Sequence, residues 1–399
     1  MMNRPEDPHE VIGCLLCGGR DLVLCYDDPE APAVTSDIKL QPASWKIYGC
    51  RRCGHLQKKR TSEFDKAVRR IYADYHLFDL SNTSDQRLFH EGRAAETRSG
   101  KIFERLSLLW KIPGAGKMLD IGCGNGAMLA AFSGRVRNWK IYGYEPDESR
   151  GERILALPGI EGFFSGELEG IREKFDLITL SHVFEHIDEP AGFLSAARKL
   201  LAPGGLLLIQ VPNLRENAFD FVVADHYSHF TPEVLSRYVS GQGFEIKFSV
   251  TDCVPKEITL GAVCSENQNP DENWYAGLDA GALTENGRQI GGWLQSVAEQ
   301  ARAEADRGRT GVFGTAIAGT WLAGVLGERA EFFVDEDPDR IGKYHLEKPV
   351  QAPGDVNSGE SVFVALPPQI AAGIAARLTK TSKARWICPV PATAGAGRR

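Results

Sequence analysis

The sequence contains the stretch Met118-Leu-Asp-Ile-Gly-Cys-Gly-Asn-Gly126, which has the pattern of a short apolar strand ending in a glycine-rich turn. The next segment, residues 127–132, is apolar and favours a helix. A strand, a glycine turn and a helix in this order let a ligand approach backbone N–H groups that a Cβ atom would shield. We therefore predict an α/β unit with a ligand at this turn.

Two classes of ligand use a turn of this kind. A dinucleotide needs the pattern G-x-G-x-x-G/A, which Gly122, Gly124 and Ala127 satisfy. Sites for S-adenosylmethionine (SAM) have the pattern D-x-G-x-G, which Asp120, Gly122 and Gly124 satisfy. The turn alone therefore leaves both classes open, and the neighbouring segments are needed to separate them.

The segments that follow favour SAM. Residues 140–146 have a second strand pattern with Glu145 at its end, where a carboxylate can hold both ribose hydroxyls of either ligand. Residues 174–187 have the pattern of a buried strand that runs into a polar edge. Residues 201–213 have that of a tight Pro-Gly-Gly turn followed by another buried strand. These later strands separate the two classes.

The chain carries, in this order, D-I-G-C-G-N-G, Y-E-P-D, F-D-L-I-x-x-x-x-V-x-E-H and L-x-P-G-G-L-L-L-I. With these motifs it resembles the class I SAM-dependent methyltransferases over roughly residues 100–265. The resemblance implies an α/β fold with a central doubly wound seven-stranded sheet, whose last two strands form an antiparallel pair. It also implies that SAM is bound by Asp120, Gly122, Cys123, Gly124, Asn125, Gly126, Glu145, Pro146, Ser181, His182 and His186.

The composition argues against several classes of protein. Hydrophobic residues make up 43% of the 399 residues and charged residues 25%, which is ordinary for a globular chain of two or three domains. The net charge of −7 lacks the basic excess that a general nucleic-acid binder needs. Residues 1–13 have no long apolar core, and no apolar run approaches about 18 residues. We therefore expect no signal peptide, no membrane span and a cytoplasmic location.

Four of the nine cysteines form two C-x2-C pairs. The reducing cytosol disfavours disulfides, whereas four thiolates complete a tetrahedral Zn²⁺ shell with no position left for water. Gly18 and Gly54 follow the two pairs, where a tight turn must expose backbone N–H groups to sulfur. We therefore predict a structural zinc, and a surface position for the neighbouring His55. The predicted zinc ligands are Cys14, Cys17, Cys50 and Cys53.

Residues 63–100 have the pattern of a helical connector. Within it, residues 71–86 are rich in Tyr, Ser, Asn and Asp, and two interpretations stay open. The segment is either a polar loop between domains or a lid that places the hydroxyls of Tyr72 and Tyr75 over the methyl donor. Polar aromatic side chains are common in ligand-binding loops, which is the reason for keeping the second interpretation.

The segment Ala224-Asp-His-Tyr-Ser-His229 follows the fifth predicted strand and contains two histidines, a carboxylate and a tyrosine. Ligands of open α/β sheets bind at the carboxyl ends of the strands, where this segment is expected to lie. Imidazole has a pKa near neutrality and can act as a general base. A histidine in a loop is also commonly structural, so the cluster alone leaves both roles open.

Residues 310–323 look like a second Rossmann-type opening, followed by strand patterns at residues 331–337 and 361–367. The three glycine positions of this opening hold Gly314, Ala316 and Gly319. The second glycine normally lets a pyrophosphate touch the backbone, so alanine there disfavours a dinucleotide site. We expect instead a Rossmann-like domain that packs against the SAM domain and helps to hold the substrate.

A four-cysteine module, a SAM domain and a Rossmann-like domain in this order resemble the three-domain sugar C-methyltransferases. These enzymes methylate a carbon of nucleotide-linked 4-keto-deoxysugars, and a histidine in their Tyr-x-Glu-His motif is the proposed base. Here Val223 replaces the tyrosine, Asp225 replaces the glutamate, and His226 is kept. The implied parts are a zinc-binding module (1–62), a helical connector and possible lid (63–100), the SAM domain (101–267), a helical linker (268–308) and the C-terminal Rossmann-like domain (309–399).

This resemblance implies a methyltransferase with a small-molecule substrate, a nucleotide sugar, and with His226 as general base. Asp225 or another neighbour is expected to orient the imidazole, and a tyrosine to bind the enolate oxygen. The predicted catalytic set is His226, Asp225, Tyr72, Tyr75, Tyr227 and His229. Two alternatives stay open: O-methylation with the same base, and a nucleotide-binding or NAD(P)-dependent protein that works through the C-terminal domain. The oligomeric state is left open.

Overall fold

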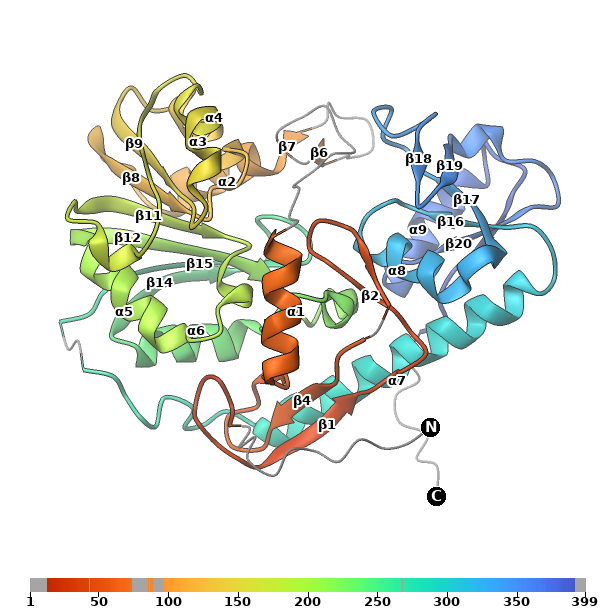
Figure 1. The fold of residues 1–399 in the computed structure, drawn as a ribbon, viewed down its shortest axis with the longest axis horizontal. Coiled ribbons are helices and arrows are strands. Elements are labelled where there is room, and N and C mark those ends of the chain that lie inside the picture. The colour runs from red at the N-terminus through yellow and green to blue at the C-terminus, as the bar shows by residue number, and fades with distance from the viewer. Residues whose placement is uncertain are drawn as a thin grey trace.

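The structure is a computed structural model that describes residues 13–42, 44–73, 85, 87–88, 96–266 and 269–391. Figure 1 shows a central sheet in yellow and green, a second sheet in blue, and red strands that lie along the long helix α7 (Ala280–Ala305). Among the described residues, no helix is both long and apolar enough to cross a membrane.

The central sheet has seven strands in the order β10-β9-β8-β11-β12-β15-β14. The strands from β10 to β12 are parallel, whereas β15 runs antiparallel to both β12 and β14. The predicted α/β sheet with an antiparallel edge pair is thereby confirmed. Its strands are β8 (Ala115–Ile121), β9 (Asn138–Tyr144), β10 (Ile160–Phe164), β11 (Phe175–Ser181), β12 (Leu201–Pro212), β14 (Phe244–Val250) and β15 (Glu257–Cys264).

Helices cover both faces of this sheet (Figure 1). On one face lie α2 (Arg98–Leu109), α3 (Ala127–Ser133) and α4 (Gly151–Leu155), and on the other α5 (Pro190–Leu200) and α6 (Pro232–Gly241). In β12, Leu206 and Leu208 pack with α2 and α3, whereas Leu207 and Ile209 pack with α5 and α6. All four side chains are buried. Because helices cover both faces of the strand, it is apolar at successive positions rather than at alternate ones.

The cysteine-containing part of the chain shares a sheet with the central domain. Three of its strands, β1 (Leu22–Tyr26), β4 (Ile47–Cys50) and β5 (Leu56–Lys58), continue into β13 (Ser228–His229) in the order β1-β4-β5-β13. The remaining elements of this part are the pair β2 (Ala33–Val34) and β3 (Leu40–Gln41) and the helix α1 (Ser62–Ala73). The cysteine pairs are therefore physically joined to the segment that follows the fifth parallel strand.

Helix α7 occupies most of the predicted linker and packs against both neighbouring sheets. Gly291 lies so close to β1 that a Cβ atom there would be 2.3 Å from the carbonyl oxygen of Cys25. Further along the helix, Leu294 and Val297 share one hydrophobic core with Trp321 of the C-terminal part. The connection is thus a packed structural element and not a loose tether.

The C-terminal sheet has six strands in the order β18-β19-β17-β16-β20-β21, and β18 alone of these is antiparallel to its neighbour. Its strands are β16 (Thr310–Phe313), β17 (Ala330–Val334), β18 (Tyr344–His345), β19 (Lys348–Gln351), β20 (Ser361–Val364) and β21 (Arg385–Ile387), with helices α8 (Ile317–Leu326) and α9 (Pro368–Leu378). Gly319 packs against the turn before α8, where a Cβ atom would lie 1.9 Å from the oxygen of Gly314. The C-terminal part is thus a mostly parallel α/β sheet, and its role as a separate Rossmann-like domain stays a prediction.

The predicted lid falls largely outside the described residues, and Tyr75 is among those not described. Tyr72 is in the last turn of α1, where it is 44% exposed. After the gap, β6 (Arg87–Leu88) pairs with β7 (Glu96–Thr97), directly before α2. The lid therefore stays a prediction.

Candidate active site

The glycine turn has the left-handed backbone that its sequence requires. Gly122, Gly124 and Gly126 have φ angles of 72°, 54° and 83°. A Cβ atom at Gly122 would lie 2.4 Å from a methyl of Val183, and one at Gly126 would lie 2.2 Å from a methyl of Leu157. Glycine is therefore needed here both for backbone conformation and for space. The turn ends at the first residues of α3.

Glu145 lies across this turn at the end of β9. The N–H of Gly124 donates a hydrogen bond of 2.5 Å to Glu145 Oε1. Burial raises the pKa of Glu145, whereas the Gly124 N–H lowers it. The carboxylate is therefore fixed beside the glycine turn, at the position from which a ribose can be bound.

Asp120 is placed differently from Glu145. Its side chain is buried, and Thr179 Oγ1 donates to Asp120 Oδ1 at 2.5 Å, which links the neighbouring strands β8 and β11. Burial raises the pKa of Asp120 to about 7, although the Thr179 hydroxyl acts in the opposite direction. The geometry makes Asp120 a support beneath the turn.

The other residues predicted at the turn have mainly backbone roles. The N–H groups of Gly122 and Cys123 donate to the carbonyl of Tyr144, at 2.9 and 3.1 Å. Asn125 Oδ1 accepts from the N–H of Ala127 at 3.3 Å, and Pro146 is exposed next to Glu145. These contacts hold β8 and β9 together at the carboxyl end of the sheet.

Arg98, at the start of α2, organises a buried polar network at this same edge of the sheet. Its guanidinium makes two hydrogen bonds to Glu257, at 2.8 and 2.9 Å. It also donates to Ser181 Oγ and to Gln210 Oε1, each at 2.9 Å. The network therefore joins the carboxyl ends of β11 and β12 to the first residue of β15.

His182 lies between two carboxylates of this network and has a φ of 54°. Its Nδ1 is 2.9 Å from Glu185 Oε1, and its Nε2 is 3.0 Å from Glu257 Oε1. Burial and the charge of Arg98 would lower the pKa of His182, but the two carboxylates outweigh them and raise it to about 9. The ring is thus held as a cation at neutral pH, beside the predicted site for the methyl donor.

The histidine loop, residues 220–229, lies next to this segment. Asp220 binds two histidines with its two oxygens, His226 Nδ1 at 2.7 Å and His229 Nδ1 at 2.6 Å. The His226 ring meets the ring of His186 edge-to-face, with 4.6 Å between their centroids. Since His186 follows Val183, which touches Gly122, the loop stands beside the glycine turn.

The remaining predicted catalytic residues are held in the loop by neighbours. Asp225 is buried and accepts hydrogen bonds from the N–H and the hydroxyl of Ser36, at 2.8 and 2.5 Å. Tyr227 donates its hydroxyl to Asp65 Oδ1 at 3.0 Å. Burial lowers the pKa of His229 to about 4, and among the described residues its Nε2 has no hydrogen-bond partner. His229 is therefore a neutral interior residue, and Asp225 and Tyr227 anchor the loop.

The region around this site matches a known family. The family model described as a methyltransferase domain matches residues 94–247. These residues are therefore similar to methyltransferase domains. The match includes the glycine turn, Glu145, Arg98 and the histidine loop, and it ends before β15 and Glu257.

Relatives of the methyltransferase domain occur among O-methyltransferases. The chain is 30% identical over 134 residues to a ubiquinone biosynthesis O-methyltransferase of Pseudomonas aeruginosa (strain UCBPP-PA14), over 31% of this chain and 53% of the relative. It is 24% identical over 156 residues to the enzyme of the same name from Psychrobacter arcticus, over 32% of this chain and 58% of the relative. The chain spans about half the length of the curated relatives it matches.

Two solved structures are also similar to the chain. A SAM-dependent methyltransferase from Clostridium acetobutylicum aligns with a TM-score of 0.36 and 14% identity, over 42% of this chain and 91% of the other. The CurJ carbon methyltransferase aligns with a TM-score of 0.36 and 16% identity, over 42% of this chain and 54% of the other.

Outside the methyltransferase domain, the four predicted zinc ligands lie together. Cys14 Sγ is 3.5 Å from Cys53 Sγ, and Cys17 Sγ is 3.6 Å from Cys50 Sγ. The four sulfur atoms all lie within 4.8 Å of one another. Tetrahedral zinc with Zn–S bonds of about 2.3 Å needs sulfur atoms about 3.8 Å apart, so this thiolate set fits the ion.

The neighbouring His55 contradicts the expectation of a surface residue. It is completely buried, and its Nε2 lies 3.2 Å from the hydroxyl of Ser228 in β13. Its burial follows from the pairing of β5 with β13, which covers this side of the cysteine pairs. Sequence spacing gave no sign of this cover, because β13 comes from a distant part of the chain.

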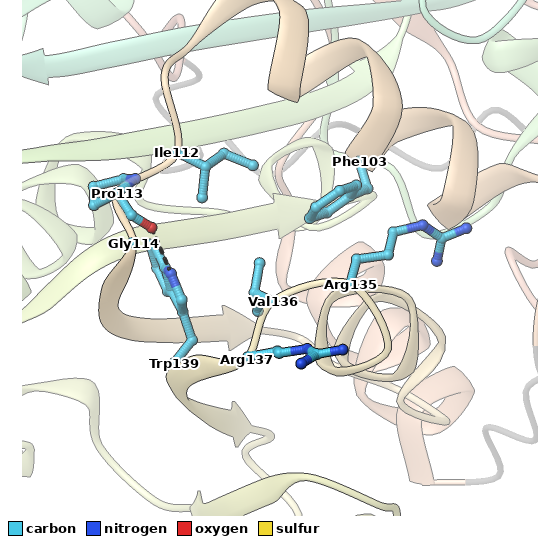
Figure 2. Close-up of a pocket in the computed structure, with 8 residues that line it drawn as sticks. All are labelled: Phe103, Ile112, Pro113, Gly114, Arg135, Val136, Arg137 and Trp139. Carbon is cyan, nitrogen blue, oxygen red and sulfur yellow. Dashed lines mark hydrogen bonds between the residues drawn. The ribbon is translucent and has the colours of Figure 1, made fainter.

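A cavity of about 280 Å³ lies at the opposite edge of the methyltransferase sheet. Figure 2 shows its lining, in which Phe103, Val136 and Trp139 stand near Arg135 and Arg137. The cavity borders the amino ends of β8 and β9, away from the glycine turn. Ligands of open α/β sheets bind at the carboxyl ends, so we do not assign this cavity to the methyl donor.

Sequence reasoning missed several polar residues of the site. Asp220 precedes the segment 224–229 by a few residues and has no motif of its own. Arg98 comes from the first turn of a helix, and Glu257 is the first residue of β15, which lies between β12 and β14. Lys58 lies in the basic sequence Lys58-Lys-Arg60, yet its side chain is buried. Which charged residues are buried together can be recognised only when the three-dimensional arrangement of the strands is known.

Proposed function

We propose that the whole chain is a SAM-dependent methyltransferase that methylates a carbon of a nucleotide-linked keto-deoxysugar, with His226 as general base. The observation that carries the proposal is the hydrogen bond from His226 to Asp220, in a loop beside the glycine turn of a methyltransferase domain. The small-molecule substrate and the cytoplasmic location belong to the same proposal.

The cofactor would be held by the turn at Gly122–Gly126 and by Glu145. When bound, SAM supplies a methyl group that is already electrophilic, so the protein has chiefly to align donor and acceptor. The glycines of the turn leave room for a ligand to approach the backbone, and Glu145 suits two ribose hydroxyls. Glu145 must exchange its contact with Gly124 for those hydroxyls, or share it with them.

His226 would take the proton from the carbon next to the keto group. With Nδ1–H donating to Asp220, the lone pair of its Nε2 is the one available to accept a proton. Burial alone would raise the pKa of Asp220, but the neighbouring histidines hold it well below its usual range. Asp220 is therefore an anion that fixes the orientation and the tautomer of His226.

The negative charge that develops on the keto oxygen needs to be stabilised. His182 lies at the same edge of the sheet, but Glu185 and Glu257 already bind both of its ring nitrogens, so it would contribute through its positive charge and not through a hydrogen bond. Tyr72 is a second candidate, since its ring lies 6.2 Å from that of His186. Tyr75, outside the described residues, stays a candidate from the sequence alone.

The same proposal includes one structural Zn²⁺ bound by Cys14, Cys17, Cys50 and Cys53. The sulfur positions support it, and a four-thiolate shell leaves no place for a reacting water. We assign this ion no step in the reaction.

O-methylation is the second candidate function. The matched relatives are named O-methyltransferases of ubiquinone biosynthesis, and an imidazole that can take a proton from carbon can also take one from a hydroxyl. The acceptor would then be a hydroxyl group, and no enolate would form.

The third candidate function belongs to another class of protein: a nucleotide-binding or NAD(P)-dependent protein whose site is in the C-terminal domain. Gly314 has a φ of 85°, and the Thr315 N–H donates to Asp335 Oδ2 at 3.1 Å, much as Gly124 donates to Glu145. Arg340 also binds Thr315 Oγ1 at 2.7 Å and fills part of this turn. Analysis of the cofactor that copurifies would separate the classes, since NAD(P) alone would favour this alternative and SAM the first.

The decisive experiment offers methyl-labelled SAM with two sets of acceptors, nucleotide-linked keto-deoxysugars and hydroxyl compounds of the quinone-precursor type. We expect label to enter a keto-deoxysugar. Label in the hydroxyl compounds alone would replace the first proposal by O-methylation, and label in neither set, with no SAM binding, would refute methyl transfer by the chain.

A further inference from the structure

We propose that Lys58 is a positioning residue that holds the histidine loop in its working position from the cysteine-containing sheet. The inference rests on the proposed role of His226 as general base. It is carried by two contacts: Lys58 Nζ donates to the carbonyl oxygens of Val223 and His226, the latter at 2.9 Å. One ammonium group therefore fixes the backbone on both sides of Asp225.

Lys58 is an unusual residue for its place. Its side chain is buried, and it is the last residue of β5, three residues after His55. Burial lowers the pKa of Lys58 to about 8, while the charges of Asp220 and Asp225 act in the opposite direction. A buried charge is costly unless it is paired and hydrogen-bonded, and here the loop supplies both carboxylates and carbonyls.

The neighbouring residue of the same strand faces the cysteine pairs. Gln57 Oε1 accepts from the N–H of Leu15, between Cys14 and Cys17, at 2.7 Å, and its Nε2 donates to the carbonyl of Gly13 at 3.2 Å. Successive side chains of a strand point to opposite sides, so Gln57 and Lys58 reach in two directions from β5. A continuous path thus runs from the predicted zinc ligands to the loop.

Backbone pairing reinforces this path. The N–H of Lys58 donates to the carbonyl of Tyr227 at 3.1 Å, and Ser228 and His229 pair with Gln57 and Leu56. The pairing fixes the end of the loop, whereas the Lys58 ammonium fixes its middle, where His226 is. We infer that the cysteine-containing sheet serves as the support of the general base.

The test compares Lys58→Met, which removes the donors and the charge, with Lys58→Gln, which keeps N–H donors without the charge. Lys46→Met is the control, because the Lys46 side chain is about half exposed and its ammonium pairs with Asp27 at 3.2 Å. For each variant, amide hydrogen exchange is measured at residues 220–229 and at residues 118–126, together with turnover and SAM affinity.

We expect Lys58→Met to speed exchange at residues 220–229 by about tenfold or more, with exchange at residues 118–126 and SAM affinity unchanged. Turnover should fall by about a hundredfold, because small displacements of a catalytic group are costly. Lys58→Gln should recover part of both losses, whereas Lys46→Met should behave like the wild type.

Equal exchange rates at residues 220–229 in Lys58→Met and Lys46→Met would overturn the proposal. A uniform rise in the exchange rates at residues 220–229 and at residues 118–126 would also overturn it, because it would show a general loss of stability. If Lys58→Met does not fold, the same comparison is made with Lys58→Gln. The exchange measurement needs no substrate, so a wild-type protein that methylates none of the sugars refutes the proposed function while the role of Lys58 is still decided.

Discussion

Asp220 binds His226 with one carboxylate oxygen and His229 with the other, although its side chain is almost completely buried. At the scale of single residues, this shared carboxylate explains why the two histidines of the loop differ. His229 is enclosed in β13, whereas His226 meets the segment that follows β11. The residue with the most influence on the predicted base is therefore one that carries no recognisable motif.

Replacing Asp220 by asparagine should separate orientation from binding. The amide keeps the shape but can present an N–H to His226 and allow the wrong tautomer, so we expect turnover to fall by about 10²–10⁴-fold. SAM affinity, measured by calorimetry, should stay within about twofold, because Asp220 does not contact the glycine turn. Unchanged turnover in Asp220→Asn would remove His226 from the role of base.

Glu145→Ala should weaken SAM binding. Each lost hydrogen bond to a charged acceptor costs about 1.5–3 kcal/mol, which corresponds to a loss of affinity of at least about tenfold. Asp147→Ala is the matched control, since Asp147 is exposed and binds Ser149. Calorimetry that gives the same affinity for both variants would exclude Glu145 from the site.

The pKa of His182 predicts a stability change in alkali. Its folded-state pKa, about 9, lies above the usual value of about 6.5, so its ion pairs stabilise the fold fully below pH 6.5. This contribution is lost as the pH rises through about 9. Because the side chain is 37% exposed, screening should keep the effect small.

Thermal unfolding from pH 6 to pH 10 checks this expectation against His182→Gln, which cannot lose the proton. The melting temperature of the wild type should fall further over this pH range than the melting temperature of His182→Gln. Parallel curves for the two proteins would mean that Glu185 and Glu257 do not hold a charged ring.

At the scale of elements, the paired strands β5 and β13 and the long helix α7 bind the parts of the chain together. Glycine allows α7 to approach β1, since Gly287 and Gly291 both lie where a Cβ atom would collide with residues of the N-terminal sheet. Gly292 in the same helix faces open space and is exposed. Gly287 and Gly291 are thus required by the close packing of α7, whereas Gly292 is not.

This difference gives a matched pair of variants. Gly291→Ala should destabilise the protein by about 1–3 kcal/mol, because its Cβ would meet the carbonyl of Cys25. Gly292→Ala should stabilise it by about 0.5–1 kcal/mol, because alanine is the better helix former. Urea unfolding measures both, and an equal effect of the two changes would disprove the close contact of α7 with β1.

At the scale of the whole molecule, most strands of the central sheet could be predicted from the sequence, because they are apolar runs next to a glycine turn or an acidic residue. Four such runs and the edge pair account for six of the seven strands. The seventh, β10 (Ile160–Phe164), is short and was not predicted from the residues themselves. The support of the histidine loop could not be predicted. It depends on a two-residue strand, Ser228–His229, whose partner lies far away in the sequence.

The whole-molecule arrangement also predicts the effect of metal removal. If zinc holds the four thiolates, its loss should release β5 and, with it, the histidine loop, while the glycine turn on the other side of β11 stays folded. Metal analysis should find about one zinc per chain, and Cys53→Ser should lose it. A chelated protein with native exchange rates at residues 220–229 would show that the loop does not depend on the ion.

The central claim is that His226 removes a proton from carbon so that this carbon can take the methyl group. The most direct test is the ¹³C NMR spectrum of the product formed from ¹³C-methyl SAM and a nucleotide-linked keto-deoxysugar, recorded for the wild type and for His226→Asn. We predict a carbon-bound methyl next to the former keto group with the wild type, and a yield lower by about 10²–10⁴-fold with His226→Asn. A methyl group on oxygen, or an undiminished carbon-methylated product from His226→Asn, would contradict the account.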